Sequence, residues 1–241
     1  MSIQSPLTVS GVLVAQDLRV VLDGHEVLHG ADLTVAPGET VAVLGAGPDA
    51  ETPHLLCRVL AGLALPASGW VHRGSHDLTR LSDARRSALR RRDIGVALDN
   101  GVLPDLPVLE NIALPLLLDG YSHRRAVSHA VDLLDHVGLS GRGARRPDTL
   151  SPRDHALVGL ARALVTAPHL VVVADPSPRL TEADAADVLD VFLGHCARIG
   201  AAVLIATESR ATAERCSRRY EVRDGRLVRS PEVHYAPQAL L

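Results

Sequence analysis

Three short apolar runs constrain the fold of this 241-residue chain more than any other feature. They read VAVLG at 41–45, LVVVA at 170–174 and AAVLIAT at 201–207. Continuous runs of this kind are typical of strands that are buried on both faces of a parallel sheet. Segments with helical spacing separate the runs along the chain. We therefore expect an α/β fold, with helices on both faces of a mostly parallel sheet.

The segment after the first run, AGPDAETPHLLCRVLAGL at 46–63, predicts a glycine-bearing loop followed by a helix. We expect this helix to cover about 53–63, with Thr52 as its N-cap and Pro53 in its first position, where the missing N–H costs nothing. Strand, loop and helix in this order are the layout of the phosphate-binding loop G-x-x-x-x-G-K-[ST]. The lysine of that motif is absent, and all 25 basic residues of the chain are arginine.

Two further segments predict local structure from their spacing. The stretch SHRRAVSHAVDLLDHVGL at 122–139 predicts a helix that Gly138 ends. Near the C-terminus, YEVRDGRLVR at 220–229 predicts a β-hairpin that turns at Asp224 and Gly225. The predicted buried face of the helix consists of Val127, Val131, Leu134 and Val137.

Composition argues against several classes of function. A formal net charge of −3 and a pI near 6.4 give no electrostatic basis for binding nucleic acid. The 12 histidines and 3 cysteines show no metal-binding spacing such as C-x-x-C or H-E-x-x-H, so we expect no metal site, and such sparse cysteines are typical of a reducing compartment. No apolar run reaches about 18 residues and no secretory signal is visible, so neither a membrane span nor export is expected.

Several longer blocks carry a family resemblance. They include EVLHGADLTVAPGETVAVLG, LSDARRSALRRRDIGVALD, LPDLPVLENIALPLLLDG, LARALVTAPHLVVVADPS and VRDGRLV. In their order and spacing these blocks resemble the nucleotide-binding subunit of ATP-binding-cassette (ABC) transporters over residues 12–229, and most closely the lipoprotein-release and macrolide-export type. The resemblance implies a P-loop NTPase-like, ABC-type core with a mostly parallel sheet, an antiparallel β edge and a helical subdomain. It also implies one domain over 1–241, with a helical lobe at about 100–165 and a short C-terminal tail at 230–241.

The resemblance implies a nucleotide site in the loop after the first run. Counting forward from Gly45 puts Glu51 and Thr52 in the lysine and Ser/Thr positions. Counting back from AGL puts Pro53 and His54 there instead. Neither register contains the lysine, and both leave Asp49 and Glu51 in the loop. One carboxylate ~5 Å from a phosphate charge costs roughly 3 kcal/mol at an effective dielectric near 20. Helix amides still favour anions, so we expect ATP and Mg²⁺ to bind weakly at most. The nucleotide-binding positions implied are Gly45, Gly47, Glu51, Thr52, Pro53 and His54.

The resemblance also implies two acidic side chains after the run at 170–174, one to hold Mg²⁺ and one to polarise the attacking water. Ala174 and Asp175 occupy these positions. An alternative register gives Asp175 the metal role, but Pro176 then replaces the base. A missing or misplaced general base lowers the rate by a factor on the order of 10²–10⁴. The metal-sensing glutamine and the switch histidine of the family are replaced by Asp99 and Glu208.

The family signature Leu-Ser-Gly-Gly-Gln reads LSPRD at 150–154 in this chain. The resemblance implies a head-to-tail dimer in which this segment approaches the ATP of the other subunit. Pro152 and Arg153 stand where two glycines would allow that approach. Ser151 and Asp154, three residues apart, favour a capping box at the start of a helix. The alternative is that Arg153 reaches the γ-phosphate of the partner subunit.

The segment LPDLPVLENIALPLLL at 103–118 corresponds to the family region that receives the membrane subunit. Its apolar residues can serve as the core of the helical lobe or as a docking surface, and we expect both roles. The docking residues predicted are Leu103, Leu106 and Leu109.

Together the altered positions predict a degenerate subunit, a pseudo-ATPase that serves a membrane permease as a structural or regulatory partner. We expect a dimer with itself or with another ABC subunit, no nucleic-acid partner, and a cytoplasmic location at the inner face of the cell membrane. One alternative is a divergent but active transport ATPase. The other is a binding module on the same fold that acts apart from transport.

Overall fold

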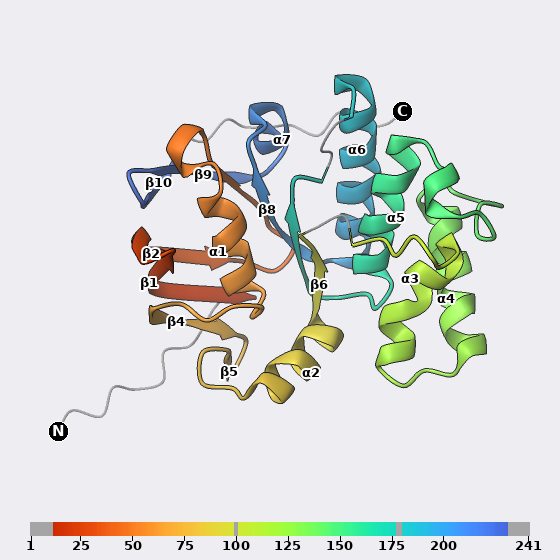
Figure 1. Cartoon of the computed structure of the whole chain (residues 1–241), viewed down its shortest axis with the longest axis horizontal. Helices are drawn as coiled ribbons and strands as arrows, with labels where there is room; N and C mark the ends of the chain where they lie inside the picture. Colours follow the sequence, from red (N-terminus) through yellow and green to blue (C-terminus); the bar gives the residue numbers. More distant parts are fainter. Residues whose placement is uncertain (1–11, 99–100, 177–179, 231–241) are drawn as a thin grey trace.

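The computed structural model describes residues 12–98, 101–176 and 180–230 (Figure 1). Its central element is a six-stranded sheet in the order β10-β9-β3-β8-β7-β6. Five strands run parallel, and β10 pairs antiparallel with β9 at one edge. The strands are β3 (Thr40–Leu44), β6 (Ile94–Ala97), β7 (Leu170–Ala174), β8 (Ala202–Thr207), β9 (Arg218–Arg223) and β10 (Arg226–Arg229). The predicted mostly parallel sheet with an antiparallel edge is confirmed.

A smaller antiparallel sheet has the order β2-β1-β4-β5. Its strands are β1 (Leu13–Leu22), β2 (His25–Val35), β4 (Ser68–Arg73) and β5 (His76–Asp77). Helix α1 (Thr52–Leu60) packs between the two sheets and contacts β1, β7 and β8. In Figure 1 this part of the molecule lies to the left of the strand β6.

Most of the remaining helices cover the other face of the large sheet or extend beyond its β6 edge (Figure 1), whereas the helix before β6 packs on the core around α1 through Leu89. Helix α3 contacts both α4 and α5, and α5 also packs on β6 and α6. The helices are α2 (Asp83–Asp93), α3 (Val108–Leu118), α4 (His123–His136), α5 (Pro152–Leu164), α6 (Glu182–Ile199) and α7 (Arg210–Glu214). None of the helices in the described ranges is long and apolar enough to span a membrane.

The central strands have two buried faces, as their sequence predicts. In β3, Val41 and Val43 join the core around α1, whereas Ala42 and Leu44 join the core under α5, α6 and α7. The side chains of β7 and β8 alternate between the same two cores. Successive side chains of a strand point to opposite faces of the sheet, so alternate residues enter different cores. Because both faces are buried, these strands are apolar along nearly their whole length.

Two predictions about helices are wrong in detail. Helix α1 begins at Thr52 and ends at Leu60, so Glu51, rather than Thr52, holds the N-cap position, with no side-chain cap. Gly62 adopts φ +67, which ends this helix before the expected residue 63. Val131 is 42% exposed, because α4 turns its smaller residues toward the core. The residues that α4 buries are Ala126, Ala130, Leu133 and Leu134, followed by Val137 just after the helix.

Candidate functional site

The loop between β3 and α1 is closed by its own backbone. Residues Gly47–Asp49 form a turn of 3-10 helix, η1. The N–H of Asp49 donates to the carbonyl of Ala46, and the N–H of Ala50 donates to that of Gly47, both at 3.2 Å. These amides are therefore used inside the loop, whereas a phosphate-binding loop points its amides at the ligand.

Proline and glycine bring the two ends of this loop into contact. A Cβ at Gly45 would lie 2.7 Å from the carbonyl oxygen of Asp49 and 2.7 Å from Cγ of Pro53. Only glycine fits at that distance, so the start of the loop packs directly on the proline ring. Thr52 is buried at 4% exposure, and His54 is half-buried.

The acidic side chains of this loop face other partners. The carboxylate of Asp49 accepts a hydrogen bond of 3.1 Å from the N–H of Asp224, in the turn between β9 and β10. Glu51 is exposed to solvent. The carboxylate of Asp49 thus ties the loop to the far hairpin, a contact between residues 175 positions apart in the chain.

The ends of β7 and β8 lie beside this loop. Asp175 has φ +40, its N–H donates to the carbonyl of Ala206 at 2.8 Å, and its carboxylate accepts from the N–H of Glu208 at 3.4 Å. Ala174 has a methyl group where the family resemblance implies a metal-supporting acid.

Burial raises the pKa of the Cys57 thiol, on α1, to about 12, so this thiol stays protonated at neutral pH. Asp99 lies outside the described residues.

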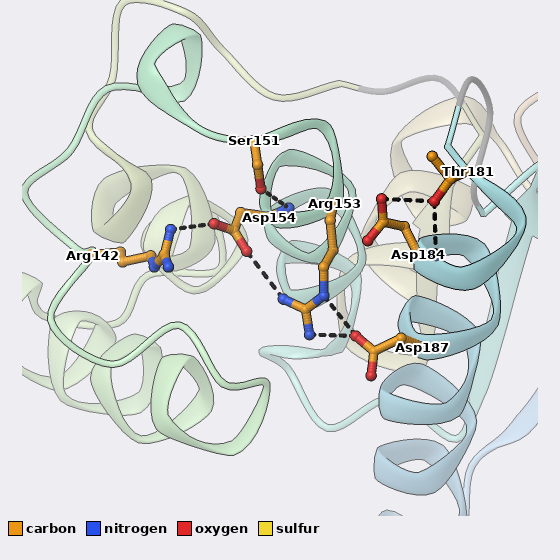
Figure 2. A network of polar contacts seen from close by, with 7 residues as sticks. All are labelled: Arg142, Ser151, Arg153, Asp154, Thr181, Asp184 and Asp187. Atoms are coloured by element: carbon orange, nitrogen blue, oxygen red, sulfur yellow. Dashed lines mark hydrogen bonds and ion pairs between the residues drawn. The ribbon is translucent and has the colours of Figure 1, made fainter.

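The signature segment begins α5 and is capped by its own serine (Figure 2). The N–H of Asp154 donates to Oγ of Ser151 at 3.1 Å, which confirms the predicted N-cap. Pro152 takes the first helical position, where its missing N–H is no loss.

The carboxylate of Asp154 does not return to Ser151 but joins an ion network, which Figure 2 shows. The Asp154 side chain is 5% exposed and pairs with Arg142 and, at 3.1 Å, with Arg153. Arg153 also donates through Nε to Asp187 on α6 at 2.6 Å. The network therefore links the start of α5 to α6 through side chains of opposite charge.

Arg153 is held within its own chain by these contacts. Burial on its own lowers the pKa of this guanidinium, but the carboxylates of Asp187 and Asp154 outweigh burial and raise the pKa. The alternative prediction, that Arg153 reaches the γ-phosphate of a partner subunit, stays a prediction, and it would require Arg153 to leave these two carboxylates.

The three predicted docking residues differ in exposure. Leu103 is 42% exposed, Leu106 is half-buried, and Leu109 packs against the main core. Asn111, which is fully buried, fixes the loop before α3 because its amide group donates to the carbonyls of Leu103, Leu106 and Pro107, and its oxygen accepts from the Leu103 N–H.

Sequence reasoning missed three of the polar residues that organise these segments. A single asparagine inside an apolar segment was a readable signal for Asn111, because a buried amide must find hydrogen-bond partners. Arg142 and Asp187 gave no local signal. No group of three or more histidine, cysteine, aspartate or glutamate side chains in the described ranges is arranged to hold a metal ion.

Comparison with known proteins agrees with this architecture. A family model described as ABC transporter matches residues 28–177. The lipoprotein-releasing system ATP-binding protein LolD of Legionella pneumophila (strain Paris) is 34% identical over 203 residues, which cover 84% of this chain and 88% of the relative. The LolD protein of Alcanivorax borkumensis is 35% identical over 205 residues, with 85% and 89% covered.

A solved structure shares the fold. The dimeric post-hydrolysis state of the ATP-binding cassette MJ0796 bound to ADP and Pi superposes with a TM-score of 0.82, at 22% identity, over 93% of this chain and 100% of that chain. The two-sheet core with its group of helices is thus the ABC cassette fold. Because the family model spans more than half of the sequence and the LolD relatives exceed 30% identity over most of it, the chain belongs to the ABC transporter family.

Proposed function

We propose that this chain is a nucleotide-binding-type subunit of an ABC transporter that does not itself hydrolyse ATP. One observation carries the proposal: the loop amides of Asp49 and Ala50 are bonded to carbonyls of the same loop. Phosphate would have to break these bonds and displace the Pro53 ring from Gly45 before it could enter the loop. The chain also contains no lysine that could replace the one missing from the motif.

The chemistry beside the loop supports the same proposal. Ala174 offers no ligand for Mg²⁺, and the carboxylate of Asp175 accepts the backbone N–H of Glu208 at 3.4 Å. The metal-assisted routes to phosphoryl transfer need at least one fixed carboxylate and a cation near the terminal phosphate.

The signature segment contributes a second reason. Pro152 has no N–H to offer a phosphate, and Arg153 is neutralised by Asp154 and Asp187. In a head-to-tail pair this segment would close over the other subunit's site only poorly. Hydrolysis in such a complex would therefore depend on the loop and acid of a better equipped partner.

The proposed partner is a membrane permease, and the proposed location is the cytoplasmic face of the membrane. The LolD relatives are named as ATP-binding proteins of a lipoprotein-releasing system, and the MJ0796 structure is dimeric. We extend membership of a transport system and the dimeric state to this chain, which we take as one domain over 1–241. Its contact with the permease is centred on Leu103, because Leu103 is the most exposed of the three docking leucines.

A second candidate function, a divergent but active transport ATPase, is favoured by the same relatives, whose name includes ATP-binding protein. ATP hydrolysis by the purified chain distinguishes the two. The proposed function predicts no Mg²⁺-dependent phosphate release above background. An active ATPase would release phosphate at a rate that falls on the order of 10²-fold or more in Asp175→Asn, the remaining acid after β7.

A further inference from the structure

A cleft lined by three arginines lies between α2, β6, α3 and α5, away from the loop after β3. Its volume is about 170 Å³. The arginines are Arg90 and Arg91 at the end of α2 and Arg162 on α5. None of the lining residues in the described ranges carries a carboxylate, and the others are Ile94, Gly95, Val96, Pro115, Ala163 and Thr166.

Two of these guanidinium groups are fixed by neutral acceptors. Arg90 donates to the carbonyl of Gly62 at 2.8 Å and to Oγ of Ser87 at 3.0 Å. Arg162 donates to the carbonyl of Gly101. Each of these bonds uses part of a guanidinium that has five N–H donors, so further donors stay available without loss of the anchoring bond. Within the described part of the chain, Arg91 makes no hydrogen bond or ion pair.

The aspartates of α2 and of the C-terminal end of α3 pair with other arginines. Asp119 pairs with Arg92 at 3.6 Å, and Asp93 pairs with Arg73 at 3.7 Å. Asp83 pairs with Arg86. None of these pairs includes one of the three cleft arginines, so among the described residues their positive charges have no acidic partner.

Burial and mutual repulsion destabilise the charged form of the arginines in this cleft. Burial lowers the pKa of Arg90, and the charges of Arg86 and Arg91 lower it further. Burial likewise lowers the pKa of Arg162. An anion between these groups would relieve both the repulsion and the lost hydration.

We propose that this cleft binds a phosphate group. Its volume corresponds to about six water molecules at ~30 Å³ each, which suits one oxyanion with a few waters. Guanidinium groups bind phosphate oxygens through paired hydrogen bonds, and the hydroxyl of Thr166 adds a neutral donor at the same wall.

A second cleft, of about 330 Å³ between α7 and the β9–β10 hairpin, also contains arginines but differs in its charge. Glu214 and Glu221 line it together with its arginines, and Glu221 pairs with Arg223. Two glutamates therefore offset part of the charge of its four arginines, whereas the described lining of the smaller cleft has three arginines and no carboxylate.

The proposed site is independent of the proposed function, because it uses no residue of the loop, the signature or the strand ends. The phosphate group can belong to a small soluble phosphate compound or to the headgroup of an anionic lipid. Both present the same oxyanion to the three arginines, and the experiment separates them.

The test is calorimetric titration of the full chain with inorganic phosphate, at ionic strength held constant with chloride. We expect saturable binding that weakens by at least about tenfold in Arg91→Gln, since a charged hydrogen-bonding group is lost. Arg85→Gln, an exposed arginine of the same helix outside the cleft, is the matched control and should bind as the unaltered chain does. Absence of phosphate binding, or equal binding by Arg91→Gln, would overturn the proposal.

Vesicle sedimentation then identifies the source of the phosphate. Binding to phosphatidylglycerol vesicles but not to phosphatidylcholine vesicles, lost in Arg91→Gln and kept in Arg85→Gln, assigns the site to a lipid headgroup. No such vesicle binding, with phosphate binding intact, assigns it to a soluble phosphate compound. Phosphate binding in the loop after β3 would be retained in Arg91→Gln. Failure of this proposal is therefore distinguishable from failure of the proposed function.

Discussion

The loop at 45–51 and the signature segment at 151–154 are both closed, but by different means. Backbone hydrogen bonds and the contact between Gly45 and Pro53 close the loop. Side-chain ion pairs from Asp154 and Arg153 hold the signature segment against α6 and against Arg142. The family resemblance places both segments at ATP.

This difference determines how each segment responds to substitution. One side chain can undo an ion network, so the signature segment should be sensitive to single changes. The backbone bonds of the loop do not depend on any one side chain, so single polar changes there should have small effects. The predictions that follow test this contrast, from the largest expected effect to the smallest.

Asp154→Ala should lower the free energy of unfolding by about 3 kcal/mol, because it removes the buried carboxylate that two arginines share. Urea unfolding followed by circular dichroism measures this loss. Asp154→Asn, which keeps the size and the acceptor oxygen, should lose less. A change below about 0.5 kcal/mol in Asp154→Ala would mean that the network does not hold the segment.

Ser151→Ala should cost about 1 kcal/mol, because the N-terminus of α5 loses the side chain that accepts the Asp154 N–H. The same unfolding measurement applies, with Ser151→Asn as the control, since asparagine is an equally good N-cap. Equal losses in both variants would show that packing, and not the cap, is responsible.

Asp187→Ala should cost less than about 1 kcal/mol, because the Asp187 side chain is 51% exposed and Arg153 keeps Asp154 as a partner. Hydrogen exchange should nevertheless be faster at the first turn of α5, since the link to α6 is gone. Unchanged exchange at that turn would argue that the pair between Arg153 and Asp187 has no role in holding the two helices together.

Asp49→Ala should have the smallest effect, about 0.5 kcal/mol, because it removes one exposed hydrogen bond to the turn at Asp224. The backbone closure of the loop should persist, so the variant should gain no affinity for ATP. Thermal unfolding and an ATP titration of Asp49→Asn provide the comparison. A variant that begins to bind ATP would show that this carboxylate, rather than the backbone, keeps the loop shut.

Sequence patterns predicted the parts of this molecule that depend on local periodicity. The buried strands β3, β7 and β8 follow from their apolar runs, and the β9–β10 hairpin follows from Asp224 and Gly225. The cap at Ser151 was likewise readable, since its partner is three residues away.

The errors and omissions arise where longer-range packing decides. Val131 fits a helical apolar face, but α4 packs through Ala126 and Ala130, whose small side chains let neighbouring helices approach. Arg153 and Asp187 lie 34 residues apart, and Asp49 and Asp224 lie 175 apart, so no local pattern could pair them. The closure of the loop was also not predicted. The absence of the lysine carries no information on which acceptors the loop N–H groups bind.

The most direct test of the central claim is a calorimetric titration of the purified chain with Mg²⁺-ATP, repeated in Arg91→Gln so that binding at the arginine cleft is separated from binding at the loop. A closed loop predicts no saturable binding up to about 1 mM, the upper end of ordinary substrate affinities, once the arginine cleft is disabled. Micromolar, Mg²⁺-dependent binding that persists in Arg91→Gln and is lost in Asp175→Asn would contradict it.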